Sequence, residues 1–325
     1  TPRWNVVRPA IRDLVSGRLE LKLGEALDSL IDRKAQLKVP ALPGRGITGK
    51  AETMLLALSS QQDIAHVAVM TKQQQPVPKL KMLPTNISVQ ELQQSASKSN
   101  VLLGVGGGKL APVYWDCVQS PHLLCFGARE TGKSNLIATV MNGLSRLGPH
   151  ECRLVVIDHR RTHLGSIDPQ MLAGYSASRS DTEQLIADTA ITLTNRLPDS
   201  TITPEALKAR DWWSGPDIAV VIDDYDLLDD ALMHPLIKLL PHARDIGLHL
   251  IVARKTGGAI RALYHPFLAE LKDQSPTVVL LGADKEDGPL FGVKLRTLPP
   301  GRATYISHGT DCGLIHLAQV TGTKT

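Results

Sequence analysis

One stretch of the chain has the residue types and spacing of a phosphate-binding loop. Eight consecutive residues fit the pattern GxxxxGK[ST]; they follow the apolar run His122–Phe126 and precede a segment with helical spacing. Glycines let a backbone wrap around phosphate oxygens, and the N terminus of a helix faces their negative charge. We therefore expect nucleotide phosphates to bind at Gly127, Ala128, Arg129, Glu130, Thr131, Gly132, Lys133 and Ser134.

Two consecutive acids complete the expected site. The five apolar residues Ile218–Ile222 predict a buried strand, and Asp223 and Asp224 follow it. We expect Asp223 and the Ser134 hydroxyl to hold Mg²⁺, while Lys133 bridges the β- and γ-phosphates of ATP. Asp224 stands where RecA-like ATPases place the general base for the attacking water. Since Asp is one methylene shorter than the usual Glu, we expect slow or conditional hydrolysis. In the alternative interpretation, Asp224 only caps or solvates the strand end.

Three further sets of residues have a functional and a purely structural interpretation. Arg254 ends an apolar run and is either a sensor of the γ-phosphate or a solvated side chain. Trp212 and Trp213 are either a partner anchor or domain packing. The stripe Ile260, Leu263, Tyr264 and Phe267 either packs into the core or forms a groove for a helix. The glycine-rich run 104–109 predicts a hairpin turn, and His159 and His163 do not predict a metal pair.

The elements that must position these residues form an α/β pattern. Because near-continuous apolar strands alternate with helices, we expect a mainly parallel sheet covered by helices on both faces. The extra strand between Lys133 and Asp223 favours a RecA-like P-loop ATPase over a small kinase. A capping box at Ser180–Glu183 predicts the start of the second helix. The expected strands are His122–Phe126, Arg153–Ile157, Ile218–Ile222, Leu248–Ala253 and Thr277–Leu281, and the expected helices are Lys133–Leu147, Asp181–Leu197, Asp226–Arg244 and Ile260–Leu271.

Composition limits the class of protein. The 325 residues are 42% hydrophobic, which is enough to bury a sizeable core, and we expect no transmembrane segment. The four cysteines lie at scattered spacings that predict no structural zinc. Residues 1–100 carry a net charge of about +6 and the rest about −2, so the second part does not predict a nucleic-acid surface. The chain starts at Thr1 with apolar residues at helical spacing, which suggests a piece of a longer polypeptide.

An internal duplication predicts the domain organisation. The run Leu19–Gly24 is followed 20 residues later by Pro43-Gly44-Arg45, and Val278–Gly282 is followed after 19 by Pro300-Gly301-Arg302. The alternative is a chance recurrence of two strand and turn segments. The polar stretch between the two copies cannot pack a core. We expect residues 1–70 to be the C-terminal part of a preceding RecA-like domain, 71–97 a linker, and 98–325 a complete P-loop ATPase domain.

The motifs together resemble the FtsK/SpoIIIE branch of RecA-like motors. The resemblance is carried by Gly127–Ser134, by Ile218–Asp224 and by Ala243–Arg254. More closely, Asp211–Gly215, Asp223–Asp226 and Gly257–Tyr264 resemble the last ATPase domain of the EccC family of type VII (ESX) secretion motors. DNA-pumping relatives carry Glu at the second acid and Thr-Gln in place of Arg254-Lys255. These departures favour the secretion branch.

The resemblance implies an ATP- and Mg²⁺-dependent motor module that is cytoplasmic, at the inner face of the membrane. Its implied partners are secreted WXG100-type helical-hairpin proteins, recognised through a C-terminal signal, and a membrane-anchored ATPase subunit. It implies a homo-oligomer when assembled and no nucleic acid. Two alternatives stay open at this point: an FtsK-like DNA translocase, and a nucleotide-binding scaffold that does not hydrolyse ATP.

Overall fold

The computed structural model describes residues 7–71, 80–92, 100–199, 202–209 and 212–320. The chain divides into two compact units, Thr1–Lys79 and Leu80–Thr325. Each unit has its own sheet. The residues with candidate chemistry all belong to the second unit.

Unit 1 is built on a three-stranded antiparallel sheet in the order β1-β2-β3. Buried Glu20 and Gln36 side chains hydrogen bond within it, and Glu20 also accepts from the Ser29 hydroxyl at 2.6 Å. Its elements are α1 (Pro9–Arg12), β1 (Leu19–Leu21), η2 (Ala26–Asp28), α2 (Arg33–Lys38), β2 (Arg45–Thr48), β3 (Thr53–Leu55) and α3 (Gln61–Met70).

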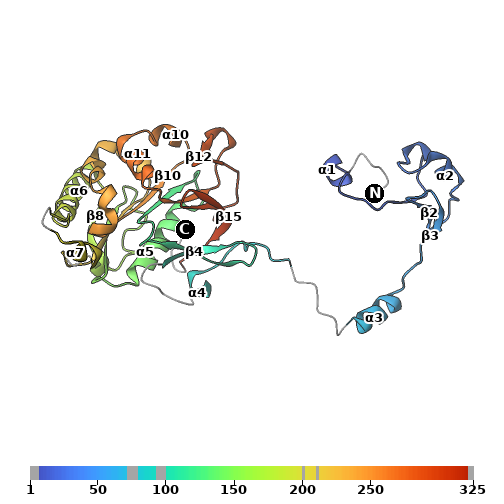
Figure 1. Ribbon diagram of the computed structural model, residues 1–325, viewed down its shortest axis with the longest axis horizontal. Coiled ribbons are helices and arrows are strands. Elements are labelled where there is room, and N and C mark those ends of the chain that lie inside the picture. Colours follow the sequence, from blue (N-terminus) through green and yellow to red (C-terminus); the bar gives the residue numbers. More distant parts are fainter. Residues whose placement is uncertain (1–6, 72–79, 93–99, 200–201, 210–211, 321–325) are drawn as a thin grey trace. The chain divides into compact units, whose positions relative to one another are not determined.

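Unit 2 contains a ten-stranded mixed sheet (Figure 1). Its helices are α4 (Val89–Leu92), α5 (Lys133–Ser145), α6 (Arg179–Thr194), α7 (Pro204–Ala209), α8 (His234–Ile237), α9 (Ala243–Ile246), α10 (Ala259–Ala262) and α11 (Pro266–Asp273), with short 3-10 turns η3 (Pro169–Met171), η4 (Tyr225–Leu227), η5 (Asp230–Met233), η6 (Leu240–His242) and η7 (Lys285–Asp287). Its strands are β4 (Asn100–Gly106), β5 (Ala111–Asp116), β6 (His122–Phe126), β7 (Cys152–Ile157), β8 (Leu172–Ser176), β9 (Asp217–Ile222), β10 (Leu248–Arg254), β11 (Thr277–Leu281), β12 (Pro289–Leu290), β13 (Val293–Lys294), β14 (Arg302–Ser307) and β15 (Thr310–Leu317).

The strand order confirms the predicted α/β architecture. The sheet runs β5-β4-β15-β14-β11-β6-β10-β9-β7-β8, and the strands from β11 to β8 pair in parallel. Strands β14, β15, β4 and β5 add an antiparallel side to this sheet. All five predicted strands are present within one residue at each end. The glycine-rich run does form the predicted turn between β4 and β5.

Apolar side chains fill both faces of the sheet, which is why these strands carry continuous apolar runs. Alternate residues of a strand point to opposite faces. On β6, Leu124 and Phe126 belong to the core under α6, α8, α9, α10 and α11, whereas Leu123 and Cys125 belong to the core under α5. The parallel strands therefore have a helix layer on each side, and their carboxyl ends meet at one edge.

Prolines divide two of the predicted helices. The expected helix Asp226–Arg244 is a series of short turns and helices, with Pro235 and Pro241 as the second residues of α8 and η6. The expected helix Ile260–Leu271 is α10 followed by α11, because Pro266 starts a new helix. Proline has no backbone N–H and cannot continue the hydrogen bonding of a preceding turn. The predicted cap was also wrong by two residues: Ser178, not Ser180, accepts the backbone N–H of Asp181 at 3.2 Å.

The predicted linker extends too far toward the second unit. Residues 80–92 belong to unit 2: Val89 is buried, and its N–H donates to the carbonyl of Gln319 at 2.9 Å. Arg302 also donates to the carbonyls of Leu83 and Pro84. A polar composition did not show these contacts, because they are made largely by the backbone. The part of the predicted linker at 72–79 and 93–97 lies outside the described residues.

The two copies of the proposed duplication share one turn. Gly44 and Gly301 have φ angles of +75° and +74°, and each precedes the arginine that starts a strand, Arg45 or Arg302. In both copies this strand pairs antiparallel with the earlier apolar strand, β1 or β11. A positive φ strongly favours glycine, so the same residue occurs at both turns. This agreement supports a duplication over a chance recurrence.

Candidate functional site

The predicted phosphate loop lies between β6 and α5, at the carboxyl edge of the parallel strands. Its first residues are tied to both neighbouring strands. The N–H of Gly127 donates to the carbonyl of Arg254, the last residue of β10, at 3.2 Å, and the N–H of Ala128 donates to the carbonyl of Gly282, just after β11, at 2.8 Å. The sheet itself therefore sets the position of the loop.

Two positions of this loop require glycine. Gly132, the residue before α5, has a φ of +114°, where other residues are strained. A Cβ at Gly127 would lie 2.5 Å from the Thr131 hydroxyl and 2.8 Å from the Leu281 Cβ. The Thr131 hydroxyl already bridges the loop by donating to the Ala128 carbonyl at 2.9 Å. Backbone geometry thus accounts for the two glycines of the motif.

The lysine of the motif lies across its own loop. The Lys133 ammonium donates to the carbonyls of Gly127 at 3.2 Å and Ala128 at 2.9 Å. These carbonyls satisfy two of its three donors until a phosphate competes for them. Arg129 and Glu130 form an ion pair at 3.3 Å on the rim, with side chains 91% and 83% exposed. Their charges are therefore in solvent and do not point into the loop.

Asp223 is a buried carboxylate with a complete set of partners. It follows β9, and its Oδ2 lies 3.0 Å from Nε2 of His163, while its Oδ1 accepts the N–H of Asp224 at 3.0 Å. Burial alone would raise the pKa of Asp223, but hydrogen bonds from His163 and Ser134 outweigh it, and the pKa lies below the usual range. Ser134 and Asp223 thus lie together as a hydroxyl and an ionised carboxylate, which are oxygen ligands that fit Mg²⁺.

Asp224 has an unusual backbone and a cationic partner. Its φ is +55°, and its Oδ2 lies 2.7 Å from Nε of Arg160. Burial and the charge of Asp223 raise the pKa of Asp224, against the opposing effect of Arg160. Its side chain makes no cap hydrogen bond to η4. The capping interpretation therefore finds no support, and solvation is limited, because this side chain is 17% exposed.

Arg254 organises its own loop. It is buried, and its guanidinium donates to the carbonyls of Lys255 at 2.7 Å and Gly257 at 3.2 Å. Lys255 in turn pairs with Asp226 at 3.2 Å. Arg254 is therefore not a solvated side chain, and a role as γ-phosphate sensor requires it to exchange these carbonyls for phosphate oxygens.

Sequence reasoning missed two residues at the acids, Arg160 and His163. Both lie on the loop after β7, and that strand pairs with β9 so that Ile157 is opposite Ile222. Residues that follow neighbouring parallel strands at the same register come together. The signal that could have found them is the basic residues directly after the predicted strand Arg153–Ile157, which lies between the phosphate loop and the acid strand. His159 has a separate partner, the Thr182 hydroxyl at 3.0 Å.

The tryptophan pair and the apolar stripe differ in how far they are packed. Trp213 donates to the Asp245 carbonyl at 2.8 Å, and the guanidinium of Arg196 lies 4.2 Å from its ring centre, which supports the packing interpretation. The predicted stripe divides: Leu263 and Phe267 are buried, but Ile260 is 40% and Tyr264 79% exposed. Two residues of the stripe therefore pack into the core, and the other two lie at the surface.

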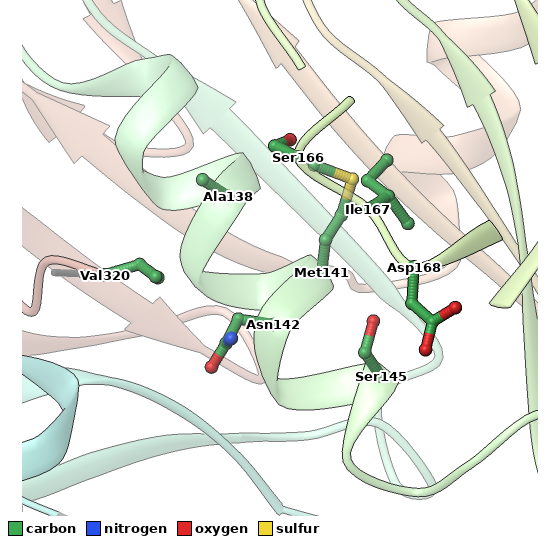
Figure 2. A pocket seen from close by; sticks show the side chains of 8 residues that line it. All are labelled: Ala138, Met141, Asn142, Ser145, Ser166, Ile167, Asp168 and Val320. Atoms are coloured by element: carbon green, nitrogen blue, oxygen red, sulfur yellow. The ribbon is translucent and has the colours of Figure 1, made fainter. Parts of the chain in front are cut away.

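A separate cavity of about 260 Å³ lies along the C-terminal half of α5. Figure 2 shows helix residues on one side and the segment 166–168 on the other, with Val320 at the edge. The phosphate loop precedes the opposite end of α5, so this cavity is not the predicted nucleotide site. Its lining is Ala138, Met141, Asn142, Ser145, Ser166, Ile167, Asp168 and Val320.

The fold and the loop define the class of protein. Residues 83–184 match the model of the FtsK/SpoIIIE family, and the second unit has a RecA-like P-loop fold. The chain is a homologue of EccC: it is 36% identical over 335 residues to the ESX secretion system protein EccC of Thermomonospora curvata, covering 97% of this chain and 26% of that protein.

Solved structures agree with this assignment. ATPases 2 and 3 of T. curvata EccC, in complex with a signal sequence peptide, match with a TM-score of 0.75 and 35% identity, over 98% of this chain and 60% of that one. The cytoplasmic domain of the same type VII secretion ATPase also matches with a TM-score of 0.75, at 36% identity, over 98% of this chain and 39% of that one. The chain spans about a quarter of the length of the curated EccC relative.

Within the described segments, no helix has the length and apolar character to cross a membrane.

Proposed function

We propose that this chain is a motor module of a type VII secretion system whose second unit binds ATP with Mg²⁺ and hydrolyses it slowly. One observation carries the nucleotide part: Lys133, Ser134 and Asp223 lie at one strand edge, with a hydroxyl beside an ionised carboxylate. Bound Mg²⁺ would shield the phosphate charge. The chain supplies the loop N–H groups, the mobile Lys133 ammonium, and two oxygen ligands from Ser134 and Asp223.

Replacing Lys133 tests the nucleotide site. Lys133→Ala removes the cation that lies on two loop carbonyls, without touching the core, so we expect loss of ATP binding with an unchanged circular dichroism spectrum. Lys109→Ala, at an exposed lysine in the β4–β5 turn, is the matched control and should bind like the wild type. Fluorescent-nucleotide titration measures both. Unchanged affinity in the Lys133 variant would contradict the proposal.

Hydrolysis depends on Asp224. This carboxylate is short for a general base and is paired with Arg160 at 2.7 Å, so its oxygen is engaged before any water is activated. A RecA-like site also normally needs a cation from a neighbouring protomer. We therefore infer that the isolated chain turns over far below ~10 s⁻¹, the median for enzymes generally. A rate near that value in a strictly monomeric sample would refute both reasons.

We infer that the partner is a secreted WXG100-type helical-hairpin protein that binds through its C-terminal signal. The relative's complex with a signal sequence peptide supports this proposal. In this chain, α10 and the residues after it expose Ile260 and Tyr264 beside a buried Leu263. An amphipathic peptide would cover that exposed apolar surface. The membrane-anchored subunit, the cytoplasmic location and assembly into a homo-oligomer are part of the same proposal, as is the origin of unit 1 from a preceding ATPase domain.

Peptide titration tests the partner, and one substitution tests the location. We expect a signal peptide to bind the full chain detectably at ~100 μM, without ATP hydrolysis. Tyr264→Ala should abolish this binding and leave the melting temperature unchanged, because Tyr264 is 79% exposed. Ile191→Ala, at an exposed apolar residue of α6, is the matched control. Peptide binding that survives Tyr264→Ala places the peptide elsewhere, and absence of binding in the wild type contradicts the partner.

The DNA translocase remains the second candidate, and the same assay separates it. Residues 101–325 carry a net charge of about −2, so this part of the chain has no net positive charge to attract the phosphates of DNA. We expect hydrolysis to respond to the peptide and not to duplex DNA. Stimulation by DNA that weakens with added salt would favour the translocase instead.

A further inference from the structure

The loop that follows β7 contacts the two acids, Asp223 and Asp224, and the edge strand β8. We call residues 158–163 the acid-support loop. Since β7 and β9 are parallel neighbours with Ile157 opposite Ile222, the loop leaves the sheet beside Asp223. The N–H of Asp223 donates to the Ile157 carbonyl at 3.1 Å. The loop and the acids therefore share one strand edge although they are about 60 residues apart in the chain.

His163 makes the central contact of this loop. Its side chain is 2% exposed, and its Nε2 lies 3.0 Å from Oδ2 of Asp223, whose side chain is equally buried. Because an ionised carboxylate only accepts, this nitrogen must carry the proton and donate. The second oxygen of Asp223 accepts the N–H of Asp224. Both oxygens are thus held, which fixes the rotation of the carboxylate.

The backbone of His163 is itself held from both sides. Its N–H donates to Oδ2 of Asp158 at 2.7 Å, and its carbonyl accepts the Ser166 hydroxyl at 2.7 Å. The Asp158 carboxylate, 1% exposed, also accepts the N–H of Thr162 at 3.1 Å and the hydroxyl of Tyr175 at 3.0 Å. Buried polar networks whose members are all bonded are rigid. These bonds therefore hold in place the backbone from which the imidazole reaches Asp223.

We propose that His163 is a positioning residue that holds Asp223 in the orientation needed to bind Mg²⁺ beside Ser134. The proposal rests on the proposed nucleotide function of this site. Partners that orient a metal ligand through a hydrogen bond commonly contribute a factor of about 10–100 to metal affinity. Without the imidazole, the hydrogen bonds that remain to Asp223 from the described residues are those of Asp224 and Ser134, and its Oδ2 can turn away from the phosphate loop.

Two substitutions of His163 separate positioning from simple packing. In His163→Gln, the side-chain amide reaches about as far as Nε2 and can donate to Asp223. In His163→Asn, the amide lies near the place of Nδ1 and falls short, although the side chain stays polar. Arg161→Gln is the matched control, because this exposed arginine lies on the same loop and has no ion pair among the described residues.

The measurement is the affinity of the full chain for a fluorescent ATP analogue, with Mg²⁺ and again with EDTA. We expect His163→Asn to lose about 10–100-fold of the affinity gained from Mg²⁺ and to keep its affinity in EDTA. His163→Gln should recover most of the gain, and Arg161→Gln should match the wild type. Melting temperatures, measured in parallel, show whether each variant folds.

Three results overturn the proposal. The first is a Mg²⁺-dependent gain in affinity that is retained in folded His163→Asn. The second is a gain that is lost equally in His163→Gln and His163→Asn, and the third is a gain that falls together with the affinity in EDTA in every variant. If His163→Asn does not fold, the comparison of His163→Gln with the wild type still tests the proposal. A Mg²⁺-dependent gain in affinity that is reduced 10-fold or more in folded His163→Gln contradicts a donor role for His163. A wild-type chain that shows no Mg²⁺-dependent nucleotide binding refutes the proposed function itself, which is a separate outcome.

Discussion

Acid should destabilise the second unit through one buried histidine, His122. This residue starts β6, the strand that leads into the phosphate loop, and it is fully buried. Its Nδ1 accepts the N–H of Leu250 at 3.2 Å. Burial, followed by the charges of His249 and Arg244, lowers the pKa of His122 to about 3. The ordinary pKa of histidine is 6.5, so between pH 6.5 and pH 3 His122 is protonated in the unfolded chain and neutral in the folded chain.

The sign and size of the effect follow from this difference. A lowered pKa in the folded state gives stability that is complete above pH 6.5 and is lost as the pH falls toward 3. The free energy of unfolding should drop by at most ~5 kcal/mol over that range, and by about 2 kcal/mol between pH 7 and pH 5. Most carboxylates titrate below pH 5, so between pH 7 and pH 5 the contribution of His122 to the free energy of unfolding can be measured with little interference from them.

His122→Asn is the informative variant. The amide oxygen can take the place of Nδ1 as acceptor for Leu250, but it does not titrate. The variant should be less stable at pH 7, because the smaller side chain leaves space, and the difference from the wild type should shrink by about 2 kcal/mol at pH 5. Urea unfolding at pH 7, 6 and 5 measures it. A difference between variant and wild type that stays constant with pH would refute the reasoning.

Two further predictions concern the acid site and the α10–α11 region. Arg160→Gln removes a partly exposed ion pair worth about 1 kcal/mol and frees an oxygen of Asp224. The steady-state rate of ATP hydrolysis should therefore rise about two- to threefold, with nucleotide affinity unchanged. A lower rate would contradict the general-base role of Asp224. Phe267→Ala removes a fully buried ring stacked 5.9 Å from that of Tyr225 and should cost about 3–5 kcal/mol in urea unfolding, against about 0.5 kcal/mol or less for Tyr264→Ala. Equal costs for these two substitutions would show that exposure does not distinguish them.

Much of the fold followed from local patterns. The five apolar runs marked the parallel strands because both faces of that sheet are buried, and a two-sided core demands continuous apolar sequence. The predicted helices failed where Pro235, Pro241 and Pro266 interrupt an otherwise apolar spacing, and a closer weighing of proline would have divided them. The antiparallel strands β14 and β15 did not stand out, since neither contains a continuous apolar run longer than two residues, Tyr305-Ile306 in β14 and Leu314-Ile315 in β15.

The sequence by itself determined the phosphate loop and the two acids after β9, because the chemistry of Lys133, Ser134 and Asp223 depends on residue type and on a strand directly before the loop or acid. Only the tertiary structure brought His163 to Asp223 and Arg160 to Asp224, and it engaged Arg254 with the carbonyls of its own loop. The physical reason is the register of β7 against β9, a pairing between distant segments. Hydrogen bonds between strands set that register, and no local pattern in either segment records it.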